Sequence, residues 1–363
     1  MAPQTGGNWI RSREFDLTFF IAPGLLSLLI VVPALLGLWP EDLEKPAFVW
    51  LAVIVGVDVA HVWSTLHRVY LNRAERRRRP WLYWGTPLGV YLLGTLLYAT
   101  NPGWFWTALA YVAVHHFIRQ QVGFMALYRG QLGESDPIAR RLDHIAIYVA
   151  TLGPVLWWHL HLPRNFCWFV PGDFIGGWQH TDLGMLVSTV LWPVYVATLG
   201  AWFGHAVFKR ASNPGRNLTM LQTVSTWLVG IVLLNGDLIF TLTNVLIHGI
   251  PYMALVWHTT SGPQTKPRLG PALARGARFL VPLLGLAFAE EFLWDVTIMH
   301  DHPQFFGEWG LPITDTLLLI VVPLLSVPQA THYVLDAFIW RLDGSNPGLR
   351  QRLFPNHESP PTN

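Results

Sequence analysis

Five histidines lie inside long apolar segments of this chain, where imidazole is an uncommon side chain: His61, His115, His116, His248 and His332. An ionisable group in hydrocarbon is costly unless it finds partners, so such groups usually mark functional sites. Neutral imidazole is a favoured ligand of iron, copper and zinc, and a low-dielectric surrounding keeps it neutral. The pattern therefore predicts a buried, histidine-rich metal centre.

Carboxylates accompany two of these histidines at helical spacing. Asp58 comes three residues before His61 and Asp336 four residues after His332, so each carboxylate shares a helix face with an imidazole. We expect both to hold the second ring nitrogen of the histidine or, for Asp336, to bind metal directly. His67 follows His61 by six residues and points about 120° away on an ideal helix. We expect it to serve a second metal or a separate inner vestibule.

The doublet His115-His116 is followed one helical turn later by Arg119 and Gln120. Neighbouring residues on a helix point about 100° apart, so one imidazole of the doublet can be a ligand while the other orients a neighbour. Arg119 and Gln120 are expected to support the ligands from behind or to contact an anionic group.

The elements that must position these side chains are transmembrane helices. The chain has 363 residues, of which 52% are hydrophobic and 13% are charged, whereas soluble domains have about 25% charged residues. Apolar runs of about 20 residues, each long enough to cross a bilayer, recur from end to end. We predict an all-α polytopic protein of about ten spans: Leu17–Trp39, Ala47–Leu71, Trp81–Ala99, Trp104–Tyr128, Leu142–Leu162, Leu183–Phe208, Leu218–Leu234, Leu238–His258, Phe279–Ile298 and Ile313–Ile339.

Basic residues follow the even-numbered spans, as Arg76, Arg140 and Arg350 illustrate, whereas the opposite loops keep only Lys45 and Arg164. The positive-inside rule then places both termini in the cytoplasm. We predict an N-terminal segment over residues 1–16, one transmembrane domain over 17–340 and a C-terminal tail over 341–363. The basic loops fit membrane orientation and not nucleic-acid binding. A bacterial inner membrane suits these loops and a chain with a single cysteine.

The five histidines also agree in depth. Counted from the cytoplasmic ends of the predicted spans, they lie roughly 11–20 Å deep, near the middle of a hydrocarbon layer about 30 Å thick. All five belong to even-numbered spans, which run in the same direction. Four helices are thus expected to bring imidazoles into one layer of the membrane.

Histidines in this number and placement resemble those of the histidine-rich integral membrane non-haem iron oxygenases, which include acyl desaturases and hydroxylases and bacterial membrane carotenoid dioxygenases. The resemblance covers the histidines on the spans and the doublet His115-His116, without the upstream histidine of a desaturase box. It implies a mono- or dinuclear iron centre, dioxygen chemistry on a lipophilic substrate taken from the membrane lipids, and an electron donor.

Other interpretations of the histidines remain open. A b-type haem could be ligated by a pair such as His61 and His248 on facing helices. Intramembrane histidine, aspartate and arginine residues also mark proton- or ion-coupled transport paths. Hydrogen-bonded core histidines that bridge helices are the simplest alternative.

Overall fold

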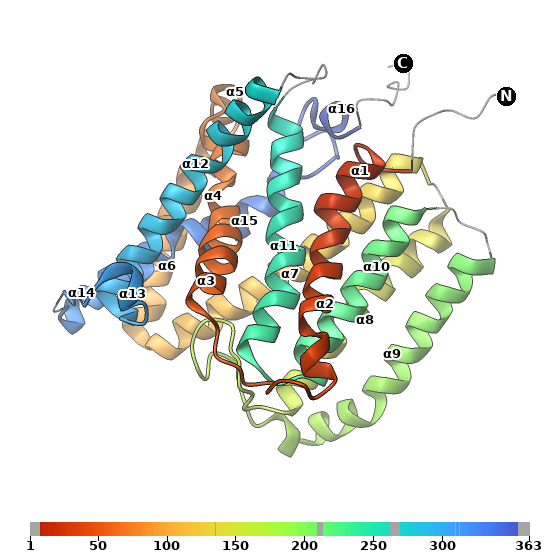
Figure 1. Ribbon diagram of the computed structural model, residues 1–363, viewed down its shortest axis with the longest axis horizontal. Coiled ribbons are helices and arrows are strands. Elements are labelled where there is room, and N and C mark those ends of the chain that lie inside the picture. Colours follow the sequence, from red (N-terminus) through yellow and green to blue (C-terminus); the bar gives the residue numbers. More distant parts are fainter. Residues whose placement is uncertain are drawn as a thin grey trace. The chain divides into compact units, whose positions relative to one another are not determined.

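The protein is built from helices and the turns that join them. The computed structural model describes residues 8–134, 136–208, 213–261, 269–308, 310–311 and 313–354, and these ranges contain no strand (Figure 1). The predicted terminal segments therefore fall partly outside the described residues, at 1–7 and 355–363. An all-α chain is confirmed for the described residues.

The helices follow one another along the chain with short connections. The α-helices are α1 (Arg13–Asp16), α2 (Ala22–Leu35), α3 (Ala47–Val49), α4 (Ala60–Trp63), α5 (Arg73–Arg78), α6 (Pro80–Thr100), α7 (Pro102–Leu132), α8 (Pro137–Leu160), α9 (Asp182–Phe208), α10 (Pro214–Trp227), α11 (Asp237–Thr260), α12 (Leu269–Trp294), α13 (Pro303–Phe306), α14 (Asp315–Leu325), α15 (Val327–Ile339) and α16 (Leu349–Leu353). Wider π-helical turns form η1 (Leu17–Ile21), η2 (Trp50–Val59), η3 (Leu66–Tyr70), η5 (Leu228–Leu233) and η6 (Asp295–Met299), and η4 (Trp178–His180) is a 3-10 helix.

Six helical stretches among the described residues are long and apolar enough to cross a membrane. They are Arg13–Leu35, Ala47–Tyr70, Asp182–Phe208, Asp237–Thr260, Gly270–Met299 and Asp315–Ile339. The other four predicted spans also form helices, namely α6, α7, α8 and α10 with η5, but these are less apolar. The structure thus supports an all-α membrane protein, while the count of about ten spans and the cytoplasmic termini stay predictions.

The stretch that carries His61 departs from ideal α geometry. Residues 50–59 and 66–70 form the π-helical segments η2 and η3, and only the short α4 between them has α-helical turns. A π-turn accommodates more residues than an α-turn, and such turns occur frequently at functional sites. Angular predictions made for an ideal helix of 3.6 residues per turn therefore do not transfer to this stretch.

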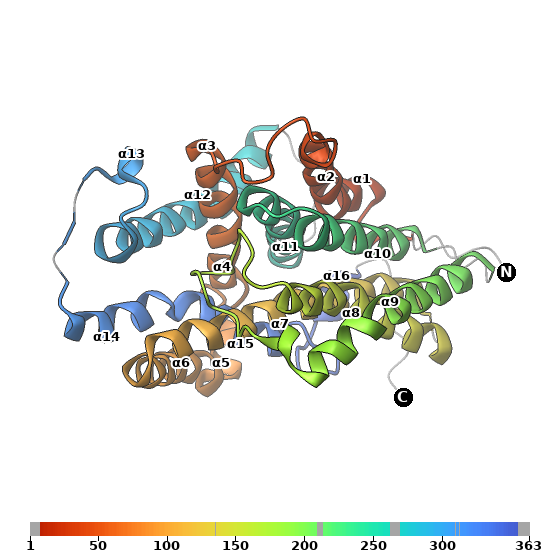
Figure 2. The same cartoon turned by 90° about the horizontal axis from the view of Figure 1, so that it is seen from below.

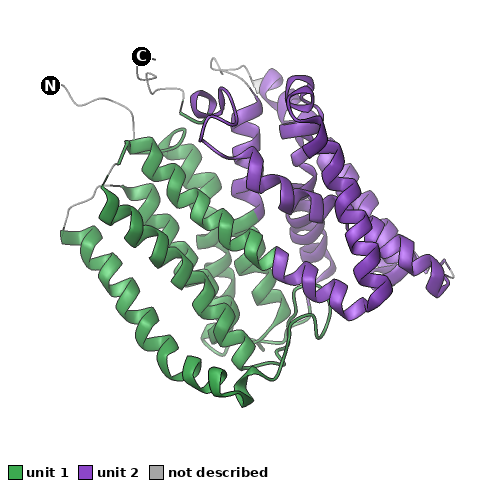
Figure 3. Cartoon of the chain, turned by 180° about the vertical axis from the view of Figure 1, so that it is seen from behind, with its two compact units in different colours: residues 1–44, 113–248, 353–363 green, residues 45–112, 249–352 purple. Residues whose placement is uncertain are grey.

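The chain divides into two compact units, and the helices α7 and α11 contribute residues to both (Figure 3). Unit 1 comprises residues 1–44, 113–248 and 353–363. Within it α8 and α9 pack along each other (Figure 2). Gly153 of α8 permits this approach, because a Cβ at that position would lie 2.6 Å from the ring of Tyr195 in α9. One core cluster of this unit contains Val122, Met125, Ala146, Ile147, Ala150, Trp202 and Met220.

Unit 2 comprises residues 45–112 and 249–352. Within it α6 packs against α14 and α15, and α12 packs against η2 and α4. One core cluster of this unit joins the stretch before His61 to α11 and α12 through Trp50, Val55, Ala60, Tyr252, Val256, Phe279, Leu283 and Ala287. The division into units does not test the prediction of one transmembrane domain, which stays a prediction.

Candidate metal centre

His61 and His332 form a buried pair within unit 2. His61 is in α4 and His332 is in α15, and each residue is only 1% exposed. Their ring centroids lie 4.9 Å apart in an edge-to-face arrangement. The hydroxyl oxygen of Thr65 lies 2.8 Å from Nδ1 of His332, within hydrogen-bonding distance. Because α4 and α15 pack against each other, the two imidazoles are held by the helix contact itself.

Both predicted carboxylates lie beside these rings. The distance from Asp58 Oδ1 to His61 Nδ1 is 3.7 Å, and the distance from Asp336 Oδ1 to His332 Nδ1 is 3.8 Å. These contacts agree with the spacings of three and four residues. The hydroxyl of Tyr252 donates a hydrogen bond of 2.6 Å to Asp336. Each carboxylate thus lies beside its histidine, and its role in orienting the ring stays a prediction.

His116 and His248 form a second buried pair, within unit 1. His116 is 5% exposed and His248 is fully buried, and their ring centroids lie 5.0 Å apart. Phe117 stacks on His248 with ring planes 6° apart and centroids 3.6 Å apart. Gln120 Nε2 donates a 3.2 Å hydrogen bond to the backbone carbonyl of His248, which ties α7 to α11. Aromatic stacking and this bond fix the place of the His248 ring.

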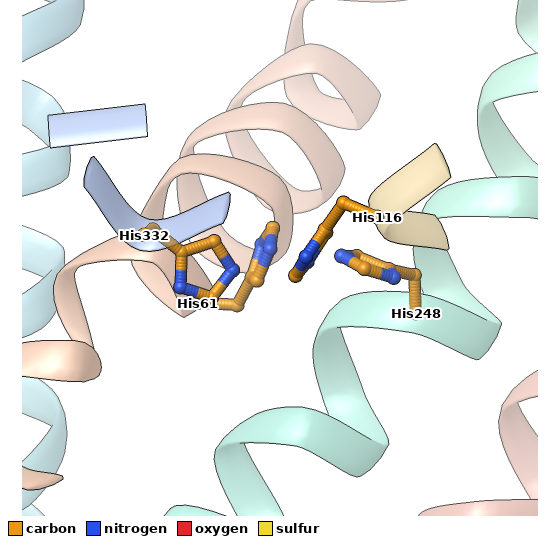
Figure 4. A group of neighbouring side chains, drawn as sticks. All are labelled: His61, His116, His248 and His332. Carbon is orange, nitrogen blue, oxygen red and sulfur yellow. The ribbon is translucent and has the colours of Figure 1, made fainter. Parts of the chain in front are cut away.

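Together the two pairs form a four-histidine group, which consists of His61, His116, His248 and His332 (Figure 4). One ring nitrogen from each residue lies within 4.8 Å of the others, and all four residues are buried. Metal–imidazole bonds are about 2.1 Å long, so two donors of one metal lie at most roughly 4.2 Å apart. Only donors on opposite sides of a metal reach this separation, and four tetrahedral donors lie roughly 3.4 Å apart, so the widest separation in the group would have to shorten by up to about 1.4 Å around one ion. The group could hold a metal ion.

Three other predicted site residues lie elsewhere on their helices. His115 and Arg119 are exposed, and Arg119 donates a 2.9 Å hydrogen bond to the hydroxyl of Tyr148. His67 packs with its ring 4.7 Å from that of Phe279 and is not one of the four clustered histidines. Of the doublet, His116 is therefore the buried member and His115 the exposed one.

Three residues around the group were not identified from the sequence. Thr65 contacts His332, Tyr252 lies with its ring 4.9 Å from the His332 ring, and Phe117 stacks on His248. A usable signal was present for two of them. Thr65 follows His61 by four residues and Tyr252 follows His248 by four, the spacing that places side chains on one helix face.

No family model, no curated protein and no solved structure matches this chain.

Proposed function

We propose that this protein is a membrane-embedded metalloenzyme whose four-histidine group holds non-haem iron, and that it oxidises or cleaves a lipophilic substrate with dioxygen. The observation that carries the proposal is the gathering of four buried imidazoles within 4.8 Å. Neutral imidazole is a favoured ligand of iron, and burial in a low-dielectric surrounding keeps it neutral. A metal ion satisfies one nitrogen of each ring at once.

The donor set favours iron. Nitrogen donors with nearby carboxylates suit iron that binds dioxygen, whereas sites with thiolate ligands select zinc, copper(I) or iron–sulfur clusters. Asp58 and Asp336 supply the carboxylates next to His61 and His332. Bound iron would supply the reaction with dioxygen, and the protein residues would hold the metal and exclude water. Tyr252 and Thr65 would keep Asp336 and His332 in position.

The same geometry argues against a b-type haem at this group. A porphyrin occupies the four in-plane positions around its iron and leaves only two axial positions for histidine. Here four imidazole nitrogens converge on one small volume, so the positions that a porphyrin needs are taken by protein ligands.

The membrane supports the choice of a lipophilic substrate. We propose about ten spans with both termini in the cytoplasm, in a bacterial inner membrane, which would set the four-histidine group near the middle of the hydrocarbon layer. A substrate dissolved in the lipid reaches such a depth without crossing water. Electrons would come from a donor on the cytoplasmic side. These features are those of the membrane non-haem iron oxygenases that the histidine pattern resembles.

Metal analysis of the full-length protein tests the proposal. Protein expressed in iron-replete medium and purified in detergent should contain about one iron per chain by mass spectrometry and show no Soret band. His116→Ala and His248→Ala should each lower the iron content by about tenfold or more, because each removes a ligand. His115→Ala is the matched control, since it deletes a neighbouring but exposed imidazole, and it should retain iron.

Two results would overturn the proposal. Wild-type protein without iron would leave the histidines as a transport path or as hydrogen-bonded core. A Soret band that His116→Ala and His248→Ala abolish would assign the group to haem instead.

A further inference from the structure

A strongly basic cavity of about 670 Å³ lies within unit 2, at the ends of η3 and α11 and beside α5 and α12. It is distinct from the four-histidine group. The cationic and imidazole side chains that line it are Arg68, Arg73, Arg275, Arg278, Arg352 and His67. We refer to it as the basic cavity.

Several donors in the basic cavity have no hydrogen-bond acceptor among the described residues. Arg68 is 2% exposed, and its Nη2 donates a 2.7 Å hydrogen bond to the carbonyl of Ile339. Among the described residues, Nε of Arg68 and Nε of Arg275 are buried without an acceptor, and Nε2 of His67 is buried without a hydrogen-bond partner. Unsatisfied buried polar atoms are costly, so these atoms point to a ligand that supplies acceptors.

The positive charge of the basic cavity is not balanced by its own walls. No acidic side chain is found among the described residues that line it. The carboxylate of Glu75 lies 3.8 Å from Nη1 of Arg68 but also accepts hydrogen bonds from Arg78 and Tyr83. Burial alone would raise the pKa of Glu75, but these hydrogen bonds and the nearby arginine charges hold the pKa below its ordinary value. Even with Glu75 ionised, the arginines outnumber it.

We propose that the basic cavity binds a phosphate-bearing anion. Arginine presents a planar fork of donors that matches phosphate oxygens in pairs, and several arginines around one site are typical of phosphate recognition. Ligand sites usually have volumes of about 300–1,000 Å³, so the cavity admits a phosphate with a further moiety. Leu71, Trp257 and Phe279 form an apolar wall for that moiety.

Two sources offer this chemistry, a soluble phosphorylated molecule and an anionic phospholipid headgroup. The first measurement uses inorganic pyrophosphate as the soluble probe. It is titrated calorimetrically into full-length protein in neutral detergent, at constant ionic strength. The double variant Arg275→Gln/Arg278→Gln should bind pyrophosphate about tenfold more weakly or worse, because each charged hydrogen bond contributes about the energy of a tenfold change in affinity. Arg140→Gln/Arg141→Gln is the control, since it removes the same charge from two exposed arginines outside the cavity, and it should bind like the wild type.

A third variant covers the case in which the arginine double variant does not fold. Thr260→Glu leaves every arginine in place and adds a carboxylate at an exposed position that lines the basic cavity. It should also weaken pyrophosphate binding by about tenfold or more. Correct folding of each variant is checked by circular dichroism and gel filtration.

The second measurement separates the two sources. Lipids that remain bound through purification are quantified by mass spectrometry for the wild type and the variants. If the source is lipid, the wild type retains an anionic phospholipid, which pyrophosphate displaces and Thr260→Glu loses. If the source is soluble, pyrophosphate binds protein in phosphatidylcholine nanodiscs and no anionic phospholipid is retained specifically. Either result supports the proposal. It is overturned if wild type, cavity variants and control bind pyrophosphate and anionic phospholipid equally, or if none of them binds either.

Discussion

At His332 a single ring nitrogen meets two polar neighbours. Thr65 Oγ1 lies 2.8 Å and Asp336 Oδ1 3.8 Å from Nδ1. Only the threonine is at hydrogen-bonding distance. Because Nδ1 is engaged in this way, Nε2 is the atom of His332 that would bind metal, and Thr65 selects it. The hydrogen bond from Tyr252 holds Asp336 beside the same ring, so these three residues act on the orientation of one ligand.

Removal of the Tyr252 hydroxyl tests this orientation. Tyr252→Phe should lower the free energy of unfolding by about 1–3 kcal/mol, because it removes a donor from the Asp336 carboxylate. It should also weaken iron binding by about 10–100-fold, the usual cost of losing a group that supports a metal ligand. Unfolding is followed in mixed detergent micelles, and metal affinity by competition with a chelator.

Tyr195→Phe provides a matched control for Tyr252→Phe. The hydroxyl of Tyr195 is buried and has no hydrogen-bond partner among the described residues, so its removal should leave stability unchanged or slightly higher. Equal losses of stability and iron in both variants would contradict the role given to Tyr252.

At the scale of the helices, α11 and η2 are in close contact through a glycine. A Cβ at Gly249 of α11 would lie 2.6 Å from Cγ1 of Val57 and 3.0 Å from its carbonyl oxygen. Gly249 directly follows His248, and Val57 directly precedes Asp58. The close approach of these two backbones therefore sets the places of residues that belong to the site or support it.

Gly249→Ala should force this contact apart. The added methyl group overpacks the contact, so the free energy of unfolding should fall by about 1–3 kcal/mol. Gly285→Ala is the comparison, because Gly285 of α12 has open space around it. It should be neutral or stabilise the protein by up to about 1 kcal/mol through helix propensity. Both are measured by unfolding in mixed micelles, and a Gly249→Ala protein as stable as Gly285→Ala would refute the tight contact.

The sequence predicted how deep along each helix the clustered histidines lie, but it did not predict which side of the helix each histidine faces. Depth along the helix axis depends only on residue count, and His61, His116, His248 and His332, which were expected at one depth, do lie together. Rotation about the axis depends on packing and on local helix type, which residue count does not supply. His115 and His116 therefore could not be told apart, and the π-helical turns before His61 were not foreseen. Thr65 and Tyr252 were missed because hydroxyl side chains in apolar helices are common and carry little signal alone.

For the whole molecule, the predicted topology can be checked with the only cysteine. Cys167 lies in the predicted outer loop between residues 162 and 183 and is partly exposed. A membrane-impermeant maleimide added to intact spheroplasts should label it, because that loop is expected on the outer face. If Cys167 were labelled only after permeabilisation, the loop would lie on the cytoplasmic face and the predicted topology would be wrong.

A reporter on the opposite face completes this topology test. In a Cys167→Ser background, Arg140→Cys places a cysteine at an exposed position in a predicted cytoplasmic loop. It should react with the same maleimide only in permeabilised spheroplasts.

The division into two compact units was not predicted, because contacts between helices far apart in the sequence cannot be recognised from composition.

Helix α11 also has a consequence for how the protein is made. The stretch Asp237–Thr260 is long and apolar enough to span a membrane, and 89% of its most apolar 18-residue window is buried by protein. The helix also carries the buried polar residues Thr243, Asn244 and His248. Such a helix would be unfavourable in lipid alone, because its polar side chains would lack protein partners there. Its neighbours η2, α7, α8 and η5 precede it in the chain, whereas α12 and α15, which also contact it, follow it. Since synthesis proceeds from the N-terminus, the ribosome completes α11 after these four earlier neighbours and before α12 and α15.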